Sequence, residues 1–192
     1  MANYRQYMDS RYCLRQILVE HNHFNDPAKK EHLKKMLLRC PAQNAVPIIN
    51  YNDPVSEEEV RNMEINALRS AGKNVVECVD NDETASQIAC LVRPKYLLIM
   101  TGVDGIYTNK DDDTTLVREI RGKDVYELVE NIEHFQNYCD GASRKGANGA
   151  RAKLEFIKEP AKQGTTVFIA NSKYRISDIM AGEVPSTKIY LG

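Results

Sequence analysis

The stretch KYLLIMTGVDGIYT, residues 95–108, decides the fold class of this chain. Its first half, KYLLIMT (95–101), is a continuous apolar run of the kind found in strands that are buried on both faces of a sheet. The run passes directly into a polar, glycine-containing turn, TGVDG (101–105). Ligands of parallel α/β sheets bind where the strands end, so this turn is a candidate binding site after a central strand.

The segments on either side alternate between helical and extended patterns. Helices are expected over 10–22, from Asp26-Pro27 onward, over 56–71, from Asp80 or Asn81 onward, over 123–132, over 149–163 and over 175–182. Strands are expected over 45–50, 74–79, 95–101, 116–120 and 165–170. Among the helices, Ser56 with Glu59 forms a possible capping box, and Gly72 would end the same helix.

This alternation predicts an α/β layer fold. Strands that are separated by helices and have continuous rather than alternating hydrophobicity are typical of a mainly parallel sheet. The sequence contains no internal repeat and no linker that would divide it. Residues 1–192 are therefore predicted to form a single domain.

The composition is typical of a soluble globular protein. Of the 192 residues, 42% are hydrophobic and 28% are charged, and the net charge of −1 gives no electrostatic case for binding nucleic acid or an anionic membrane. No apolar stretch approaches the roughly 20 residues of a membrane span, and the first ten residues lack the pattern of a signal peptide. The cysteines are widely spaced and form no CxxC pair, which predicts thiols in a reducing cytoplasm. They are Cys13, Cys40, Cys78, Cys90 and Cys139.

Four polar segments are candidates for chemistry. They are INYND (49–53), DND (80–82), TGVDGIYT (101–108) and GANGARAK (146–153). Taken singly, each also has a structural explanation as a turn or a helix cap. The last segment lacks the spacing of a Walker A loop. A small-residue loop before a helix nevertheless offers backbone N–H groups and the positive end of a helix dipole, which phosphate binding requires.

In this order, and followed by FIANS (168–172), IMAGE (179–183) and ST (186–187), the four segments resemble the glutamate 5-kinase branch of the amino acid kinase family. The family patterns are VPIINEND, GDND, LLLTDxxGLYT, GTGGMxTK and a closing IAxG…GxxxGT. The resemblance extends over about residues 4 to 190. Uridylate kinases and aspartokinases share the fold and the TDVDGIYT-like turn, but the pairing of NxND with DND points to the glutamate branch. The resemblance implies a three-layer αβα sandwich of the amino acid kinase, carbamate kinase-like type.

The resemblance also implies an activity: ATP-dependent phosphorylation of the side-chain carboxylate of glutamate, at the entry to proline synthesis. The implied ligands are ATP and glutamate. Mg²⁺ would come with ATP, held mainly by phosphates and water, and no protein metal site is implied. On the substrate side, Asp53, Asn52 and Asn81 match positions that bind the amino acid. Asp82 matches an aspartate that organises the active-site lysines and is a catalytic candidate.

On the nucleotide side, the resemblance implies contacts from two segments. The matching residues are Thr101, Gly102, Asp104, Tyr107, Ala147, Asn148, Gly149, Ala150, Arg151, Ala152 and Lys153. Lys153 is also a catalytic candidate, because its ammonium would neutralise charge on the transferring phosphoryl group. The family usually assembles, so a homo-oligomer is possible, whereas nucleic acid and membrane are not expected partners.

The chain departs from the family pattern at several places. The family begins with a strand, a lysine and a glycine-rich turn that binds the β- and γ-phosphates, and this chain is expected to lack that N-terminal segment. An insertion over 56–79 separates the two substrate-binding segments and either reshapes the pocket or is a tolerated surface insertion. Gly102 replaces an aspartate, and Ala147 and Ala152 replace threonines. Pro160 is expected to kink or end the last long helix.

These departures keep other hypotheses open. The chain could be a catalytically impaired nucleotide-binding or regulatory remnant of an amino acid kinase, or a related kinase for another small acidic substrate or for uridylate. The histidines match no family motif and are expected at the surface or at helix ends. They are His21, His23, His32 and His134.

Overall fold

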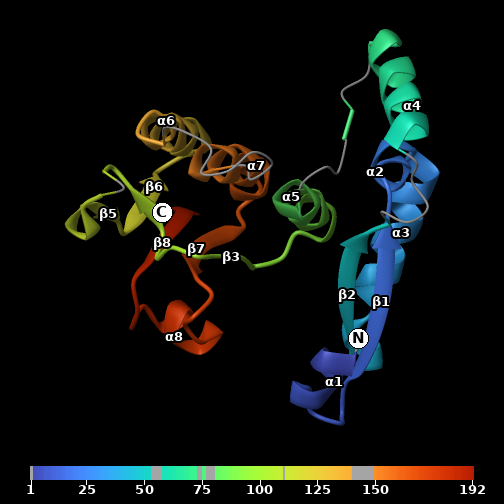
Figure 1. The fold of residues 1–192 in the computed structure, drawn as a ribbon, viewed down its shortest axis with the longest axis horizontal. Coiled ribbons are helices and arrows are strands. Elements are labelled where there is room, and N and C mark those ends of the chain that lie inside the picture. The colour runs from blue at the N-terminus through green and yellow to red at the C-terminus, as the bar shows by residue number, and fades with distance from the viewer. Residues whose placement is uncertain (1, 53–57, 73–74, 77–80, 110, 140–148) are drawn as a thin grey trace. The chain divides into compact units, whose positions relative to one another are not determined.

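The computed structural model describes residues 2–52, 58–72, 75–76, 81–109, 111–139 and 149–192. Their contacts divide the chain into two compact units, Met1–Gln87 and Ile88–Gly192 (Figure 1). A single domain over 1–192 stays a prediction. Within the described ranges, no helix combines the length and the apolar character that crossing a membrane requires.

The first unit is built on two parallel strands with helices around them (Figure 1). Strand β1 pairs with β2 over seven positions, from Cys13↔Ala45 to Val19↔Tyr51. Its elements are α1 (Ala2–Tyr7), β1 (Cys13–Val19), α2 (Asn22–Asn25), α3 (Pro27–Arg39), the 3-10 helix η1 (Pro41–Gln43), β2 (Ala45–Tyr51) and α4 (Glu58–Ser70). Helix α5 (Asn81–Val92) spans the boundary between the units.

The prediction of a helix over 10–22 is wrong, because residues 13–19 form β1. Ile17 and Val19 are buried at a spacing of two, while Leu18 between them is 43% exposed. That alternation is the period of a strand. The same apolar residues also fit a helical spacing, and pairing with β2 decides between the two.

The start of α3 is as predicted. The Asp26 side chain accepts a hydrogen bond from the backbone nitrogen of Lys29 at 2.9 Å, and Pro27 occupies the first turn. Leu33 and Leu37 are buried at helical spacing. Local capping therefore fixes this helix from its own sequence.

The segment between the predicted substrate residues contains α4, as expected. Gly72 follows its end with φ +71°, a backbone conformation that glycine adopts without strain. Ser56 of the proposed capping box lies outside the described residues. Of the strand predicted over 74–79, Val75 and Val76 have no regular structure, and the remaining residues also lie outside the described part.

The second unit contains a four-stranded sheet in the order β3-β7-β8-β6 and a short two-stranded ribbon, β4-β5. Strand β3 is parallel to β7, β6 is parallel to β8, and β7 and β8 are antiparallel. The strands are β3 (Tyr96–Thr101), β4 (Ile106–Tyr107), β5 (Leu116–Val117), β6 (Glu119–Gly122), β7 (Thr166–Asn171) and β8 (Ser186–Leu191). The helices are the 3-10 helix η2 (Asp113–Thr115), α6 (Val125–Gln136), α7 (Ala150–Lys162) and α8 (Ile176–Ala181).

Helices cover both faces of this sheet. Val167 and Ile169 of β7 belong to a core with Leu128 and Ile132 of α6 and Leu154 of α7. On the opposite face, Phe168 and Ala170 pack with Ile179 of α8. The α/β class and the three layers are therefore confirmed here, and three of the five pairings among the described strands are parallel.

Two details of the sheet differ from the prediction. Strand β3 is confirmed, but it lies at one end of the four-stranded sheet, and Tyr96 and Met100 are 37% and 39% exposed, so it is not buried on both faces. Strand β8 was not expected. Its sequence, STKIYL, has few apolar residues, although Thr187 and Ile189 are fully buried.

The remaining elements follow the predictions closely. The segment 116–120 divides into the end-to-end strands β5 and β6. In α5, Ala89 is buried, whereas Ile88 is half-buried. Helix α7 continues two residues past Pro160 and ends at Lys162.

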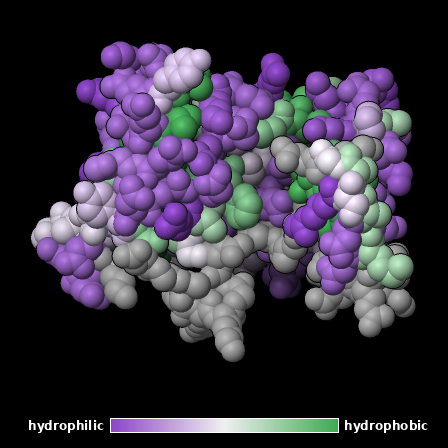
Figure 2. All heavy atoms as spheres, turned by 90° about the horizontal axis from the view of Figure 1, so that it is seen from above, coloured by the Kyte–Doolittle hydropathy of each residue, from purple (hydrophilic) through white to green (hydrophobic). Residues whose placement is uncertain are grey.

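Hydrophilic residues cover most of the face that Figure 2 shows.

Candidate functional site

The second unit contains a cavity where β3 and β7 end. Its volume is about 620 Å³, within the usual range for small-molecule sites. The lining comes from the turn after β3, the segment from β4 to the start of η2, the residues that follow α6, the start of α7 and the end of β7 with the turn after it. The lining residues are Gly102, Val103, Asp104, Gly105, Tyr107, Thr108, Asn109, Asp111, Asp113, Tyr138, Cys139, Gly149, Ala150, Asn171 and Lys173.

The turn after β3 is held by side chains at its start. The hydroxyl of Thr101 accepts a hydrogen bond from the backbone nitrogen of Val103 at 3.1 Å. From the end of β7, the Asn171 amide donates to the carbonyl oxygen of Gly102 at 3.0 Å. Thr101 therefore shapes the turn, and Gly102 presents its backbone to the cavity.

The end of the same turn is fixed from β8. The buried hydroxyl of Thr187 accepts from the backbone nitrogen of Ile106 at 2.8 Å and donates to the carbonyl oxygen of Val117 at 2.6 Å. Gly105 packs so closely that an added Cβ would collide with the Thr187 hydroxyl and would lie 2.9 Å from Leu116. The small residue at 105 is therefore a packing requirement.

Asp104 lies in the cavity wall with its carboxylate in polar contacts. Its Oδ1 is 3.0 Å from Lys173 Nζ, and its Oδ2 accepts from the Tyr174 hydroxyl at 3.3 Å. Partial burial acts to raise the pKa of Asp104, but the bonds from Lys173, Asn171 and Tyr174 outweigh it and hold the pKa below its usual value. Asp104 is thus ionised at neutral pH and faces a cation.

Burial, together with the negative charges of Asp104 and Asp113, raises the pKa of the Tyr107 hydroxyl above its usual value. Tyr107 therefore stays protonated at neutral pH and can donate a hydrogen bond inside the cavity.

The start of α7 forms another part of the wall. Gly149 is the N-cap residue in an extended conformation, without a side-chain cap hydrogen bond, and Ala150 is the first helical residue. The first backbone N–H groups of a helix have no partner within the helix. With the positive end of the helix dipole, they suit an anionic group.

The predicted nucleotide residues are partly brought together. Among those that the structure describes, five line the cavity, namely Gly102, Asp104, Tyr107, Gly149 and Ala150. Arg151, Ala152 and Lys153 lie in the first turn of α7 but are not among the lining residues, and Lys153 is half-buried. Ala147 and Asn148 lie outside the described residues.

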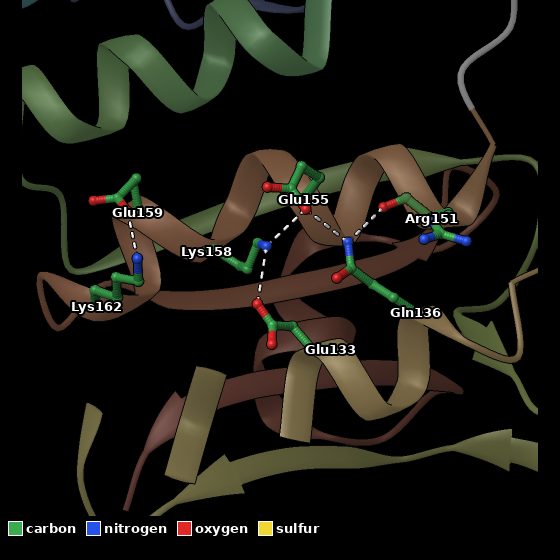
Figure 3. Close-up of polar contacts among 7 residues, drawn as sticks. All are labelled: Glu133, Gln136, Arg151, Glu155, Lys158, Glu159 and Lys162. Atoms are coloured by element: carbon green, nitrogen blue, oxygen red, sulfur yellow. Dashed lines mark hydrogen bonds and ion pairs between the residues drawn. The ribbon is translucent and has the colours of Figure 1, made fainter. Parts of the chain in front are cut away.

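A polar network joins α6 to the start of α7 (Figure 3). The buried Gln136 amide donates to the Arg151 carbonyl oxygen at 3.1 Å and to the Glu155 carboxylate at 3.0 Å. Lys158 Nζ lies 2.7 Å from Glu155 and 3.4 Å from Glu133. The network thus ties the first turn of α7, which borders the cavity, to the end of α6, which is followed by two lining residues, Tyr138 and Cys139.

The opposite charges in this network stabilise each other's ionised forms. Burial acts to raise the pKa of Glu155, but the bonds from Lys158 and Gln136 hold it below its usual value. Burial acts to lower the pKa of Lys158, but the two carboxylates hold it above its usual value. Both groups are therefore charged over the whole neutral range.

The predicted substrate residues belong to the first unit. Asn52 follows β2, and its amide donates to the Glu20 carboxylate at 2.7 Å. Asn81 is exposed and Asp82 half-buried in the first turn of α5. Asp53 lies outside the described residues.

Sequence reasoning missed several residues of these sites. Asn171 and Lys173 line the cavity, and their only sequence signal is the polar end, ANSK, of the strand over 165–170. Glu20 and Gln136 do not belong to any of the sequence motifs. His21 lies at the N-cap of α2, as expected for a helix-end histidine, but it is only 4% exposed.

Known proteins resemble this chain over most of its length. A model of the amino acid kinase family matches residues 1–171. The chain is 30% identical over 158 residues to a glutamate 5-kinase of Streptococcus suis (strain 05ZYH33), a match of 82% of this chain and 38% of that protein.

Two further relatives give the same picture. Identity to a glutamate 5-kinase of Shouchella clausii (strain KSM-K16) is 26% over 185 residues, or 94% of this chain and 43% of that protein. Identity to a glutamate 5-kinase of Idiomarina loihiensis is 25% over 175 residues, which is 90% of this chain and 42% of that protein. The chain spans about two-fifths of the length of these curated relatives. Since the family model covers residues 1–171, which leaves out only α8 and β8 among the described helices and strands, this chain belongs to the amino acid kinase family.

Proposed function

We propose that this chain is part of an ATP-dependent kinase that phosphorylates the side-chain carboxylate of glutamate, and that the cavity of its second unit binds the nucleotide. The observation that carries this proposal is the meeting of the TGVDG turn and the start of α7 around one cavity. The glutamate 5-kinases among the relatives support the choice of acceptor.

The residues around the cavity fit a nucleotide. The helix start at Gly149 and Ala150 offers N–H groups without a capping side chain, and the ammonium of Lys173 adds positive charge. These groups would hold phosphate oxygens, and Tyr107 would donate a hydrogen bond to the nucleotide. Bound ATP supplies the phosphoryl group, and its Mg²⁺ neutralises phosphate charge.

The substrate side of the proposal uses Asp53, Asn52, Asn81 and Asp82. A carboxylate at Asp53 suits the α-ammonium group of an amino acid, and the amides suit its carboxylate. The acceptor carboxylate of glutamate is ionised at neutral pH, so no residue has to remove a proton from it. The remaining tasks of this chain are orientation and neutralisation of charge.

Calorimetry with Mg-ATP and an ADP-release assay with and without glutamate test the proposal. The protein is expected to bind Mg-ATP and to release ADP faster when glutamate is present. Lys153→Ala is expected to reduce the glutamate-dependent rate by about a hundredfold, whereas Lys162→Ala, at the other end of α7, keeps it. ADP release that is independent of glutamate and unchanged in Lys153→Ala would contradict the proposal.

A second candidate function is nucleotide binding without turnover. Lys153 is absent from the described lining of the cavity, and Gly102 and Ala152 replace side chains that the family pattern contains. This function predicts Mg-ATP binding by calorimetry but no ADP release with glutamate, aspartate or uridylate as acceptor. Release with aspartate or uridylate alone would instead identify a related kinase.

A further inference from the structure

Residues 20–25, EHNHFN, connect β1 to α3 and contain the short helix α2. This 20–25 segment contacts the residue Asn52, shortly before the inserted region (56–79), and two places within that region, Glu64 of α4 and Val76 near its end. The contacts come from three side chains, Glu20, His21 and Asn25. All of these residues belong to the first unit.

The first contact is made before the insertion. Glu20 accepts a hydrogen bond from the Asn52 amide at 2.7 Å through one carboxylate oxygen and from the Asn22 amide at 3.2 Å through the other. The backbone nitrogen of Glu20 donates to His23 Nδ1 at 3.0 Å, which fixes the turn in which Glu20 lies. Asn52 immediately precedes Asp53, so this contact sets the chain position next to a proposed substrate carboxylate.

The second contact reaches α4 itself. His21 Nε2 lies 2.8 Å from a carboxylate oxygen of Glu64. The His21 side chain is 5% exposed, whereas that of Glu64 is 54% exposed. The inserted helix is therefore attached through a buried group of the 20–25 segment.

The third contact is made near the end of the insertion, at Val76. The Asn25 amide donates to the Val76 carbonyl oxygen at 2.9 Å, and its oxygen accepts from the Val76 backbone nitrogen at 3.0 Å. Asn25 thus bonds both backbone groups of one residue, in the way that a neighbouring strand would. Val76 precedes Asn81 by five residues.

We propose that the 20–25 segment is a positioning element for the amino-acid substrate site, which holds Asn52 before the insertion and Val76 near its end in place. The inference rests on the proposed function, since it takes these residues as the ones that bind an acidic amino acid. Closing a long insertion has an entropic cost, and contacts at both of its ends limit the conformations that a substrate would otherwise have to order. A purely surface insertion would not need one segment to contact both the residue Asn52 before it and Val76 near its end.

The test uses Asn25→Ala and Glu64→Ala in the full chain, with Asn66→Ala and Glu31→Ala as matched controls on exposed positions of α4 and α3. Hydrogen exchange of the Val76 amide is expected to be about tenfold faster in Asn25→Ala, because its acceptor is removed. The dissociation constant for glutamate is expected to rise about tenfold in both test variants. The dissociation constant for Mg-ATP should stay the same, because the cavity is lined by residues of the second unit.

Three outcomes would overturn the inference. Unchanged exchange of Val76 in Asn25→Ala would show that the contact does not hold the chain. An equal loss of glutamate and Mg-ATP affinity would show a general loss of folding. If Asn25→Ala does not fold, the glutamate and Mg-ATP affinities of Glu64→Ala provide the test. If the unmodified protein binds no glutamate while Asn25→Ala still speeds Val76 exchange, the proposed substrate is wrong and the substrate role of the segment falls with it.

Discussion

The hydroxyl of Thr187 accepts a hydrogen bond from the backbone nitrogen of Ile106, 81 residues earlier in the chain, at 2.8 Å. The same hydroxyl donates to the carbonyl oxygen of Val117 at 2.6 Å. One fully buried side chain of β8 therefore fixes both the end of the turn that lines the cavity and the ribbon beside it.

Replacing this hydroxyl should destabilise the second unit. Thr187→Val keeps the shape but leaves the buried Ile106 nitrogen without an acceptor, and we expect a loss of about 1–3 kcal/mol in the free energy of unfolding. Urea denaturation measures it. Thr187→Ser retains the hydroxyl and should lose clearly less; equal losses in the two variants would show that packing, not hydrogen bonding, is the cause.

Two glycines of the same turn should respond differently to alanine. In Gly105→Ala, the new Cβ would collide with the hydroxyl of Thr187, and we expect a loss of about 1–3 kcal/mol from overpacking. Gly102→Ala meets no atom within 4 Å and should leave the unfolding free energy nearly unchanged. Thermal or urea denaturation compares the two, and similar stabilities would contradict the packing argument.

The network between α6 and α7 should affect both stability and nucleotide affinity. Gln136→Leu removes the hydrogen bonds to the Arg151 carbonyl oxygen and to Glu155, at a cost of about 1–2 kcal/mol. Because the first turn of α7 borders the cavity, Mg-ATP affinity should also fall in calorimetry. Gln6→Leu, on the exposed surface of α1, is the control and should change neither quantity.

The ion pair of Asp104 predicts a pH dependence of stability. Its pKa is lower in the folded chain, so its ionised form stabilises the fold above the unfolded pKa, about 3.9. This stabilisation is lost as the pH falls through the folded pKa. Asp104→Asn should therefore lower the melting temperature at pH 7 by about 2–4 °C.

Melting curves between pH 2.5 and pH 7 provide the check. The difference in melting temperature between Asp104→Asn and the unmodified protein should shrink below about pH 4. Lys173→Met removes the cation that Asp104 faces and should reduce the same difference. A difference that stays constant down to pH 2.5 would show that the ionisation of Asp104 does not stabilise the fold.

Much of the fold could be predicted because its signals are local. The Asp26 cap, the apolar run of β3 and the positive φ of Gly72 each depend on a few neighbouring residues. The turn of the candidate site was predictable for the same reason, since TGVDG directly follows a strand. GANG precedes a helix in the same way, and its Gly149 is the N-cap of α7.

Other elements could not be predicted, because their partners are distant in the sequence. The apolar residues of 13–19 fit a helix as well as a strand, and only pairing with β2 decides. The weakly apolar β8 is a strand because β7 and β6 flank it. The contacts of Lys173 with Asp104 and of Asn25 with Val76 join residues that share no motif.

The sequence by itself determined the α/β class, the family resemblance and the turn that lines the cavity, because apolar runs, caps and motifs act over a few residues. Only the tertiary structure decided which polar side chains support these segments. Thr187, Gln136 and His21 are buried, and each contacts a residue of another element: Ile106, Arg151 and Glu64, respectively. A buried polar group is stable only where a partner meets it, and the sequence does not state where that partner lies.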